Sequence, residues 1–178
     1  MTISVDKRGN LPYYLPIGWY RHALKVVDKY PNDKLWLGHD NVAGEWPVAF
    51  HGTHAGAIKG IKEKGLLVTQ TDVKREEAVE NGGVEYDKPG LYVATHCTGG
   101  AHPRYTKTFD VKSSSDVTET YRVVFQCRVK PNAYTSHRSP VDKGHAWRFV
   151  DPEAIRPYGI LVKNEATPDP HVEDVKEE

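Results

Sequence analysis

The chain has 178 residues with 24 basic and 24 acidic side chains, so its formal net charge at pH 7 is zero. This length suits one domain with a hydrophobic core, and the balanced charge argues against a general nucleic-acid binder. Two cysteines, Cys97 and Cys127, allow at most one disulfide and fit a reducing compartment, so we expect free thiols.

The hydropathy of the chain indicates whether the protein is exported or inserted into a membrane. The N-terminal segment MTISVDKRGNLPYYLPIGWY lacks the apolar core of a signal peptide. No other segment approaches the roughly 20 apolar residues that a membrane span requires. We therefore expect a cytoplasmic or nuclear protein that is a monomer and has no membrane partner.

The N-terminal part predicts one amphipathic helix. Apolar residues recur at helical spacing between Ile17 and Lys29, and Pro31 follows the run. The recurring residues are Ile17, Tyr20, Leu24 and Val27. We expect a helix over 17–29, preceded by an extended lead-in at LPYYLP.

The next predicted elements are a short strand and a second helix. Trp46–Phe50 is a short apolar run that predicts a strand, and helical spacing predicts a helix over His54–Lys64. Thr53 can cap the first N–H groups of this helix, and Gly65 stands where a left-handed C-terminal cap is preferred. The side chains expected to face inward are Ala57, Ile58 and Ile61.

Two polar stretches flank the next predicted strand, Leu91–Thr95. Thr69–Pro89 is highly charged and contains a pair of glycines, which predicts a long loop with one helical turn at KREEAVE. Loops of this length in compact domains are usually functional or disordered. Gly99–Thr118 is also polar, and we expect a second loop there.

The clearest strand is predicted over Tyr121–Val129. Apolar side chains alternate there with Arg122, Gln126 and Arg128, so the apolar set is expected to face the core and the polar set to face solvent. Trp147–Val150 and Tyr158–Lys163 predict two further strands.

The order of these elements predicts an α+β fold with a mixed or antiparallel sheet and a few short helices. Few connections have the length and helical pattern of parallel crossovers, and the glycine motifs of doubly wound nucleotide-binding folds are missing from the sequence. We expect one domain over 1–163, with its core at 46–163, and a disordered acidic tail over 164–178.

The segment FHGT carries the first candidate site. It places His51, the bare backbone of Gly52 and the Thr53 hydroxyl where a strand ends and a helix begins. Without a Cβ, Gly52 lets its N–H and C=O approach a flat ligand and pair with an amide. A capped turn with a satisfied histidine is the competing interpretation.

The order of motifs that begins with FHGT resembles that of a known protein family. A helix, KGLL, a loop, PGLYVAT and a tyrosine in GGAHPRYTK follow one another, much as in the poly(ADP-ribose) polymerase-like ADP-ribosyltransferases of the diphtheria-toxin type. That family has a strand-borne H-G-[ST], then G-[VIL]-Y-F-A, then a second tyrosine. The resemblance covers roughly Trp46 to Lys163 and is strongest at His51–Thr53 and Gly90–Ala94.

The resemblance implies an ADP-ribosyltransferase-like fold of split β-sheets and a site for NAD, the substrate, with no metal. In the family pattern His51 holds an adenosine ribose hydroxyl, and the backbone of Gly52, next to Thr53, holds the nicotinamide carboxamide. Tyr92 and Tyr105 then flank the nicotinamide ring, which suits two aromatic faces against a cationic ring.

The chain departs from the family at its third motif. The family has a glutamate at the start of a late strand, about thirteen residues before the tyrosine of a P-x-Y-type segment. Counting back by the same distance from Tyr158 gives His145 instead. The resemblance therefore implies a mono-ADP-ribosyltransferase or an NAD glycohydrolase rather than a chain-elongating polymerase, with His51, Tyr92 and His145 as catalytic candidates. Neutral imidazole at His145 can accept a ribose hydroxyl proton. The acceptor is open, with a protein favoured over nucleic acid.

Other functions stay open on the sequence alone. A degenerate NAD, ADP-ribose or protein-binding module is compatible with the missing glutamate. One further hypothesis is a zinc site built from the pair His51 and His54 and the cluster His96, Cys97 and His102. A Cys97 nucleophile and a nucleic-acid face on YRVVFQCRV are two others. The carboxylates nearest in sequence to the missing one are Glu45, Asp151 and Glu153.

Overall fold

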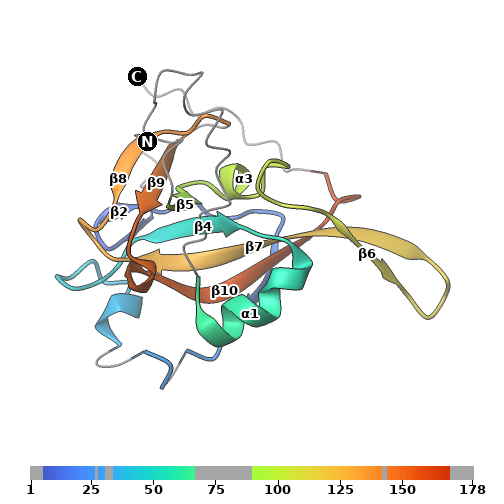
Figure 1. Ribbon diagram of the computed structural model, residues 1–178, viewed down its shortest axis with the longest axis horizontal. Helices are drawn as coiled ribbons and strands as arrows, with labels where there is room; N and C mark the ends of the chain where they lie inside the picture. Colours follow the sequence, from blue (N-terminus) through green and yellow to red (C-terminus); the bar gives the residue numbers. More distant parts are fainter. Residues whose placement is uncertain (1–5, 27, 31–33, 67–89, 142–143, 169–178) are drawn as a thin grey trace.

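The computed structural model describes residues 6–26, 28–30, 34–66, 90–141 and 144–168, and it is built around one large antiparallel sheet (Figure 1). In spatial order the strands are β3 (Tyr20–Ala23), β10 (Ile155–Asn164), β7 (Thr118–Val129), β4 (Val48–Gly52), β5 (Leu91–Ala94), β9 (His145–Phe149) and β8 (Thr135–Arg138), with β6 (Phe109–Lys112) beside β7. β1 (Lys7–Arg8) and β2 (Leu11–Pro12) form a separate pair.

The helical elements are short. They are η1 (Leu35–Leu37), η2 (Ala55–Ala57), α1 (Ile58–Lys64), α3 (Cys97–Gly100) and η4 (Pro152–Ala154). Every strand pairing in the described part of the chain is antiparallel, which agrees with the broad α+β prediction.

Strand β7 lies in the interior of the sheet, and its C-terminal half is buried on both faces. β4 pairs with it from Val48 opposite Arg128 to Gly52 opposite Val124, and β10 pairs along its other edge. The whole run Val123–Val129 is buried, so the alternation in the sequence does not separate a core face from a solvent face.

We call the two faces the α1 face and the α3 face, after the helices that pack on them (Figure 1). On the α1 face, Ile58 and Ile61 of α1 pack against a cluster that includes Ala49, Val93, Phe125, Cys127, Trp147 and Phe149. On the α3 face, Cys97 and Ala101 pack with Val48, Phe50, Val124 and Leu161, and with Tyr13 and Trp19 from the N-terminal segment.

Polar side chains of β7 hold the N-terminal segment on the α3 face. Gln126 accepts a hydrogen bond from Arg21 Nε at 2.6 Å and donates one to the Tyr13 hydroxyl at 2.8 Å. Gln126 and Arg128 are 1% and 3% exposed. The prediction that they face solvent is therefore wrong, because residues far away in the sequence cover them.

Arg128 makes the densest set of these contacts. Its guanidinium donates to the backbone carbonyl oxygens of Trp46 at 2.5 Å, Leu37 at 3.0 Å and Gly38 at 2.8 Å. Desolvation lowers the pKa of Arg128 from its ordinary value, and interactions with Tyr158 and Glu45 oppose this effect. A buried guanidinium with these acceptors fixes the loop between η1 and β4 onto the sheet.

The predicted helix over Ile17–Lys29 is wrong. Gly18 has a φ of +84°, which ends any helix there, and the chain continues as β3 at the edge of the sheet. Ile17 and Tyr20 are 59% and 71% exposed, so their helical spacing does not mark a buried face. Pairing with the free edge of β10 outweighs the local pattern.

The other predicted strands and the α1 helix are present with shifted ends. The polar stretch Gly99–Thr118 is only partly a loop, because it contains the end of α3 and all of β6. The predicted loop at Thr69–Pro89 lies outside the described residues. In the predicted tail, Asn164 is the last residue of β10 and Glu165 N–H donates to Thr120 O, whereas 169–178 lie outside the described residues.

Both cysteines are free and buried, as expected, and burial raises the pKa of the Cys127 thiol. Among the described residues, no helix is long and apolar enough to cross a bilayer.

We predict that Arg128→Leu lowers the free energy of unfolding by about 3 kcal/mol, because three buried carbonyl groups lose their donor. Arg128→Lys should fall in between, since an ammonium group cannot match the planar fork of a guanidinium. Urea unfolding followed by circular dichroism measures both. Arg138→Leu, at an exposed strand position, is the control and should change stability little; an equal loss in both leucine variants would contradict this role of Arg128.

Candidate functional site

The candidate site lies where β4 and β5 separate. Among the described residues, Phe50 and Ala94 are the one pair that joins these strands in the ladder. Toward Gly52 the ladder is not continued, and we call the gap on that side of the pair the split. The family-type motifs of the sequence meet here, because FHGT ends β4 and GLYVA forms β5.

A side-chain bond crosses the split. His51 Nδ1 lies 3.0 Å from the backbone carbonyl oxygen of Tyr92. A carbonyl oxygen only accepts hydrogen bonds, so Nδ1 carries the proton and the Nε2 of the neutral ring is an acceptor. The half-buried imidazole thus takes the place of a backbone hydrogen bond between β4 and β5, and its tautomer is defined.

Gly52 is required by close packing against the segment that contains α3. A Cβ at this position would lie 2.2 Å from the Gly100 carbonyl oxygen and 2.8 Å from Tyr105 Cβ. The glycine therefore has a structural reason that needs no ligand. The same contact brings Tyr105 beside the end of β4 on the α3 face. His51 pairs with Phe125 of the α1-face cluster, so its side chain projects to the α1 face instead.

The two predicted tyrosines share one face of the sheet. Leu91 and Val93 belong to the α1-face cluster, so Tyr92 between them projects to the α3 face, where the chain from α3 to Tyr105 also lies. Tyr92 is half-buried and Tyr105 is 42% exposed. Both rings are therefore partly exposed on the α3 face of the sheet, beside the split.

Thr53 does not cap the following helix, so this prediction is wrong. The residue before η2 is His54, which is extended and makes no side-chain cap bond, and the helix starts with a 3₁₀ turn before α1. Thr53 itself is only 5% exposed. The predicted C-terminal cap is present, since Gly65 has a φ of +80° and donates to Ile61 O.

His145 is placed apart from the other candidates. It lies on the other side of the Phe50–Ala94 pair, where its N–H donates to Thr95 Oγ1 at 2.9 Å and its carbonyl accepts from Thr95 N–H at 2.9 Å. Alternation along β9 also puts its exposed side chain on the face opposite Tyr92.

Register identifies residues that motif counting missed. Ala146 pairs with Ala94 and Arg148 with Tyr92, so these two residues of β9 share the face of Tyr92. His137 of β8 pairs with Ala146, and its ring meets the Tyr92 ring edge to face, with centroids 6.0 Å apart. The alternation of side chains along the sequence HAWRF is the signal that could have predicted that Ala146 and Arg148 share a face.

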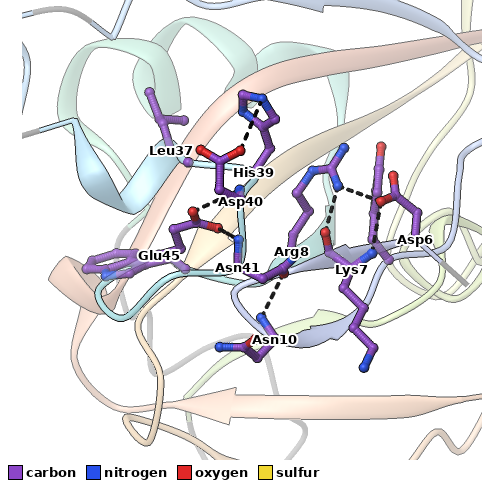
Figure 2. Close-up of polar contacts among 12 residues, drawn as sticks. Asp6, Lys7, Arg8, Asn10, Leu37, His39, Asp40, Asn41 and Glu45 are labelled. Atoms are coloured by element: carbon purple, nitrogen blue, oxygen red, sulfur yellow. Dashed lines mark hydrogen bonds and ion pairs between the residues drawn. The ribbon is translucent and has the colours of Figure 1, made fainter.

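The alternative carboxylates have structural roles. Glu45 is buried at 2% exposure and accepts hydrogen bonds from the backbone N–H groups of Asp40 and Asn41, both at 2.9 Å (Figure 2). Burial acts to raise the pKa of Glu45, but these N–H donors and the charge of Arg128 leave it below its ordinary value. Asp151 caps η4 by accepting from Glu153 N–H at 2.9 Å.

The histidines proposed as zinc ligands are used otherwise. His96 stacks on Tyr14 with ring centroids 3.8 Å apart, and His102 Nδ1 accepts from Arg104 N–H. The described residues bring no three histidine, cysteine or acidic side chains together in a metal-binding arrangement. Cys97 is buried at 6% exposure, which disfavours a nucleophilic role.

No model of a known protein family matches the chain. The site is therefore defined by its own geometry around the split: a histidine of defined tautomer that projects to the α1 face, and a tightly packed glycine with two partly exposed tyrosines on the α3 face.

We predict that Gly52→Ala destabilises the fold by about 2 kcal/mol, because the new methyl group collides with the Gly100 carbonyl. The control is Gly60→Ala on the exposed side of α1, where a Cβ meets no atom within 4 Å. Helix propensity should make this variant about 0.5–1 kcal/mol more stable. Thermal unfolding of both variants measures the difference, and equal effects would contradict the packing role of Gly52.

We also predict a pH-dependent contribution from Glu45. Its pKa is lowered in the folded state, so its stabilising effect is present above its ordinary pKa of 4.5 and is lost as the pH falls through the lower folded value. Glu45→Gln should lower the melting temperature at pH 7 and reduce the loss of stability on acidification below pH 4.5. Melting curves at several pH values test this; parallel curves would contradict it.

Proposed function

We propose that this protein is an NAD-dependent mono-ADP-ribosyltransferase, which cleaves the nicotinamide–ribose bond of NAD and transfers ADP-ribose to an acceptor. The observation that carries the proposal is the direct bond between His51 and the backbone of Tyr92. It joins the two motifs on which the resemblance to poly(ADP-ribose) polymerase-like transferases depends, at a split in the sheet as that fold would have it.

Each residue at the split has a chemical role in this proposal. His51 donates through Nδ1 to Tyr92, so its Nε2 is the atom that accepts a hydrogen bond from a ribose hydroxyl of NAD. The backbone of Gly52 pairs with the nicotinamide carboxamide. Tyr92 and Tyr105 hold the nicotinamide ring on the α3 face through aromatic contacts.

The reaction proceeds by loss of nicotinamide. The bond between the ring nitrogen and the ribose anomeric carbon breaks, its electron pair leaves with nicotinamide, and an oxocarbenium-like sugar is attacked by the acceptor nucleophile. The aromatic rings and hydrogen bonds of the site accelerate the reaction, because they fit the charge distribution of this transition state better than that of the ground state.

Transfer of a single ADP-ribose unit fits the residues around the split. On the face of Tyr92, the β9 residue opposite Ala94 is Ala146, which has no acid–base group. Activation of a second ribose for chain elongation would need a carboxylate there. We assign His145 a lesser role than the sequence did, since it lies across the Phe50–Ala94 pair.

A protein acceptor is favoured over nucleic acid in this proposal. The net charge is zero, and Arg122 and Arg128 of the hypothetical nucleic-acid face on β7 are bonded to carbonyl groups within the protein. Arg122 is bonded to Ala101 O and Glu165, and Arg128 to the three carbonyls of the N-terminal part.

A binding module for NAD or ADP-ribose is the second candidate. Ala146 favours it, because the β9 position opposite Ala94 supplies no acid or base, and a site that lacks one there can hold the dinucleotide without turnover. The two candidate functions differ in whether the protein releases nicotinamide from NAD.

We predict that the protein releases nicotinamide from labelled NAD and that His51→Ala reduces the rate about a hundredfold. Tyr92→Phe should keep most of the activity because the ring remains, whereas Tyr92→Ala should lose it. His54→Ala, which changes an exposed neighbouring histidine, is the matched control. Chromatography of released nicotinamide measures all four variants.

The possible outcomes separate the candidates. Binding of NAD by calorimetry without nicotinamide release supports the module, provided that His51→Ala weakens the binding. Neither binding nor release in the wild-type protein refutes both candidates. Equal losses in His51→Ala and His54→Ala would show that the assay does not report on the split.

A further inference from the structure

Strand β6 has a free outer edge. It pairs with β7 from Phe109 opposite Tyr121 to Lys112 opposite Thr118, and no other strand of the described chain pairs with it. Figure 1 shows the hairpin of β6 and the start of β7 extending beyond the rest of the sheet. Within the described ranges, the β6 backbone makes no hydrogen bond to any segment other than β7. The outer N–H and C=O groups of β6 are therefore open to pairing with a further strand.

One face of this hairpin is largely apolar. Phe109 of β6 pairs with Tyr121 of β7, and their rings stack with centroids 6.1 Å apart. At the next position on this face, Val111 pairs with Glu119, and Val111 is 44% exposed. Tyr121 stands an even number of residues before Phe125 of the α1-face cluster, so this is the α1 face. A strand added at the edge would meet exposed apolar and aromatic surface here.

Glu119 is the charged residue on this face of the hairpin, and no described residue gives it a cationic partner. Its Oε2 accepts from the Tyr121 hydroxyl at 3.1 Å, and its Oε1 accepts from the Asn164 amide at 3.0 Å. Both donors are neutral. The neighbouring cations Lys112 and Arg122 lie on the opposite face and have acidic partners. A carboxylate beside two stacked rings is complementary to a cation that can also lie against an aromatic ring.

The position of Glu119 selects a long side chain. Neighbouring strands of a sheet are about 4.8 Å apart, so a strand added to β6 would lie about 10 Å from the β7 backbone at Glu119. A side chain on its α1 face must extend over Val111 to reach the carboxylate. Arginine has this length, and its planar guanidinium both stacks on aromatic rings and bonds carboxylates through two N–H groups. The face therefore suits arginine better than lysine.

We propose that the free edge of β6 binds an extended segment of a protein partner as an added strand. An arginine of that segment lies on the α1 face, against the Phe109 and Tyr121 rings, and bonds to Glu119. Backbone pairing supplies the common part of the affinity, and the arginine supplies the specificity. This inference does not depend on the function proposed for the split.

The test is fluorescence anisotropy of the full chain with a labelled, capped peptide, Thr-Val-Thr-Arg-Thr-Val-Thr, whose valines and arginine share one face. Citrulline in place of the arginine keeps the shape but removes the charge, and it should weaken binding about tenfold. Glu119→Gln should cause the same loss with the arginine peptide. With the citrulline peptide Glu119→Gln should cause no further loss, because the two changes remove one interaction. Independent, additive losses would overturn the proposal.

Asp110→Asn is the matched control. Asp110 is an exposed residue of β6 on the opposite face, where its Oδ1 accepts from the Thr120 hydroxyl at 2.7 Å. It carries the same charge in the same hairpin, so this variant should change the affinity less than about twofold, since exposed charges are screened. Equal losses in Asp110→Asn and Glu119→Gln would mean that the peptide responds only to net charge, which would overturn the proposal.

N-methylated peptides test the added strand without changing the protein. One peptide carries the methyl groups on its threonines, the other on its valines and arginine. Only every second N–H of an added strand faces the edge that it joins, so one peptide should lose binding and the other should keep it. The proposal is overturned if the unmodified peptide does not bind or if the two methylated peptides behave alike. The citrulline and N-methyl comparisons use the wild-type protein, so they do not depend on the folding of a variant.

Discussion

The contact between Arg128 and three backbone carbonyls is the constraint on which the architecture depends. It fixes the loop before β4 over the α3 face, while Gln126 holds Tyr13 and Arg21 there through its amide. Arg156 adds a second anchor, since its guanidinium lies 4.3 Å from the Trp46 ring centroid. The central strand β7 is thereby covered on one face by apolar packing, and on the other by an apolar cluster together with directional polar bonds.

This arrangement determines where the candidate site is. β4 pairs with β7 over its whole length, so His51 and Gly52 are held by a strand that is buried on both faces. β5 belongs to the β9–β8 side and meets β4 at Phe50 and Ala94. The split is the boundary between two well-paired sets of strands, and the site residues take their positions from both.

Local pattern predicted the elements whose partners are near in sequence or whose apolar runs are long. The strands predicted over Trp46–Phe50, Leu91–Thr95 and Tyr121–Val129 and the helix that contains IKGIKEK follow from short apolar runs and periodicity. The edge strand β3 does not, because its stability comes from β10, which lies far along the chain. The polar residues of β7 were assigned to solvent for the same reason: alternation shows which residues share a face, and only tertiary structure shows what covers it. His51 and Tyr92 could be brought together by resemblance, whereas the position of His145 required the register of β9.

The joint between β4 and β5 has a mechanical consequence. One ladder pair and one imidazole bond connect the two sets of strands in the described residues, while each set keeps its own complete ladders. Small changes in the width of the joint therefore disturb few hydrogen bonds on either side. A flat ligand with an amide group beside Gly52 would supply hydrogen bonds that the ladder lacks there and would join the two sets of strands into one continuous sheet.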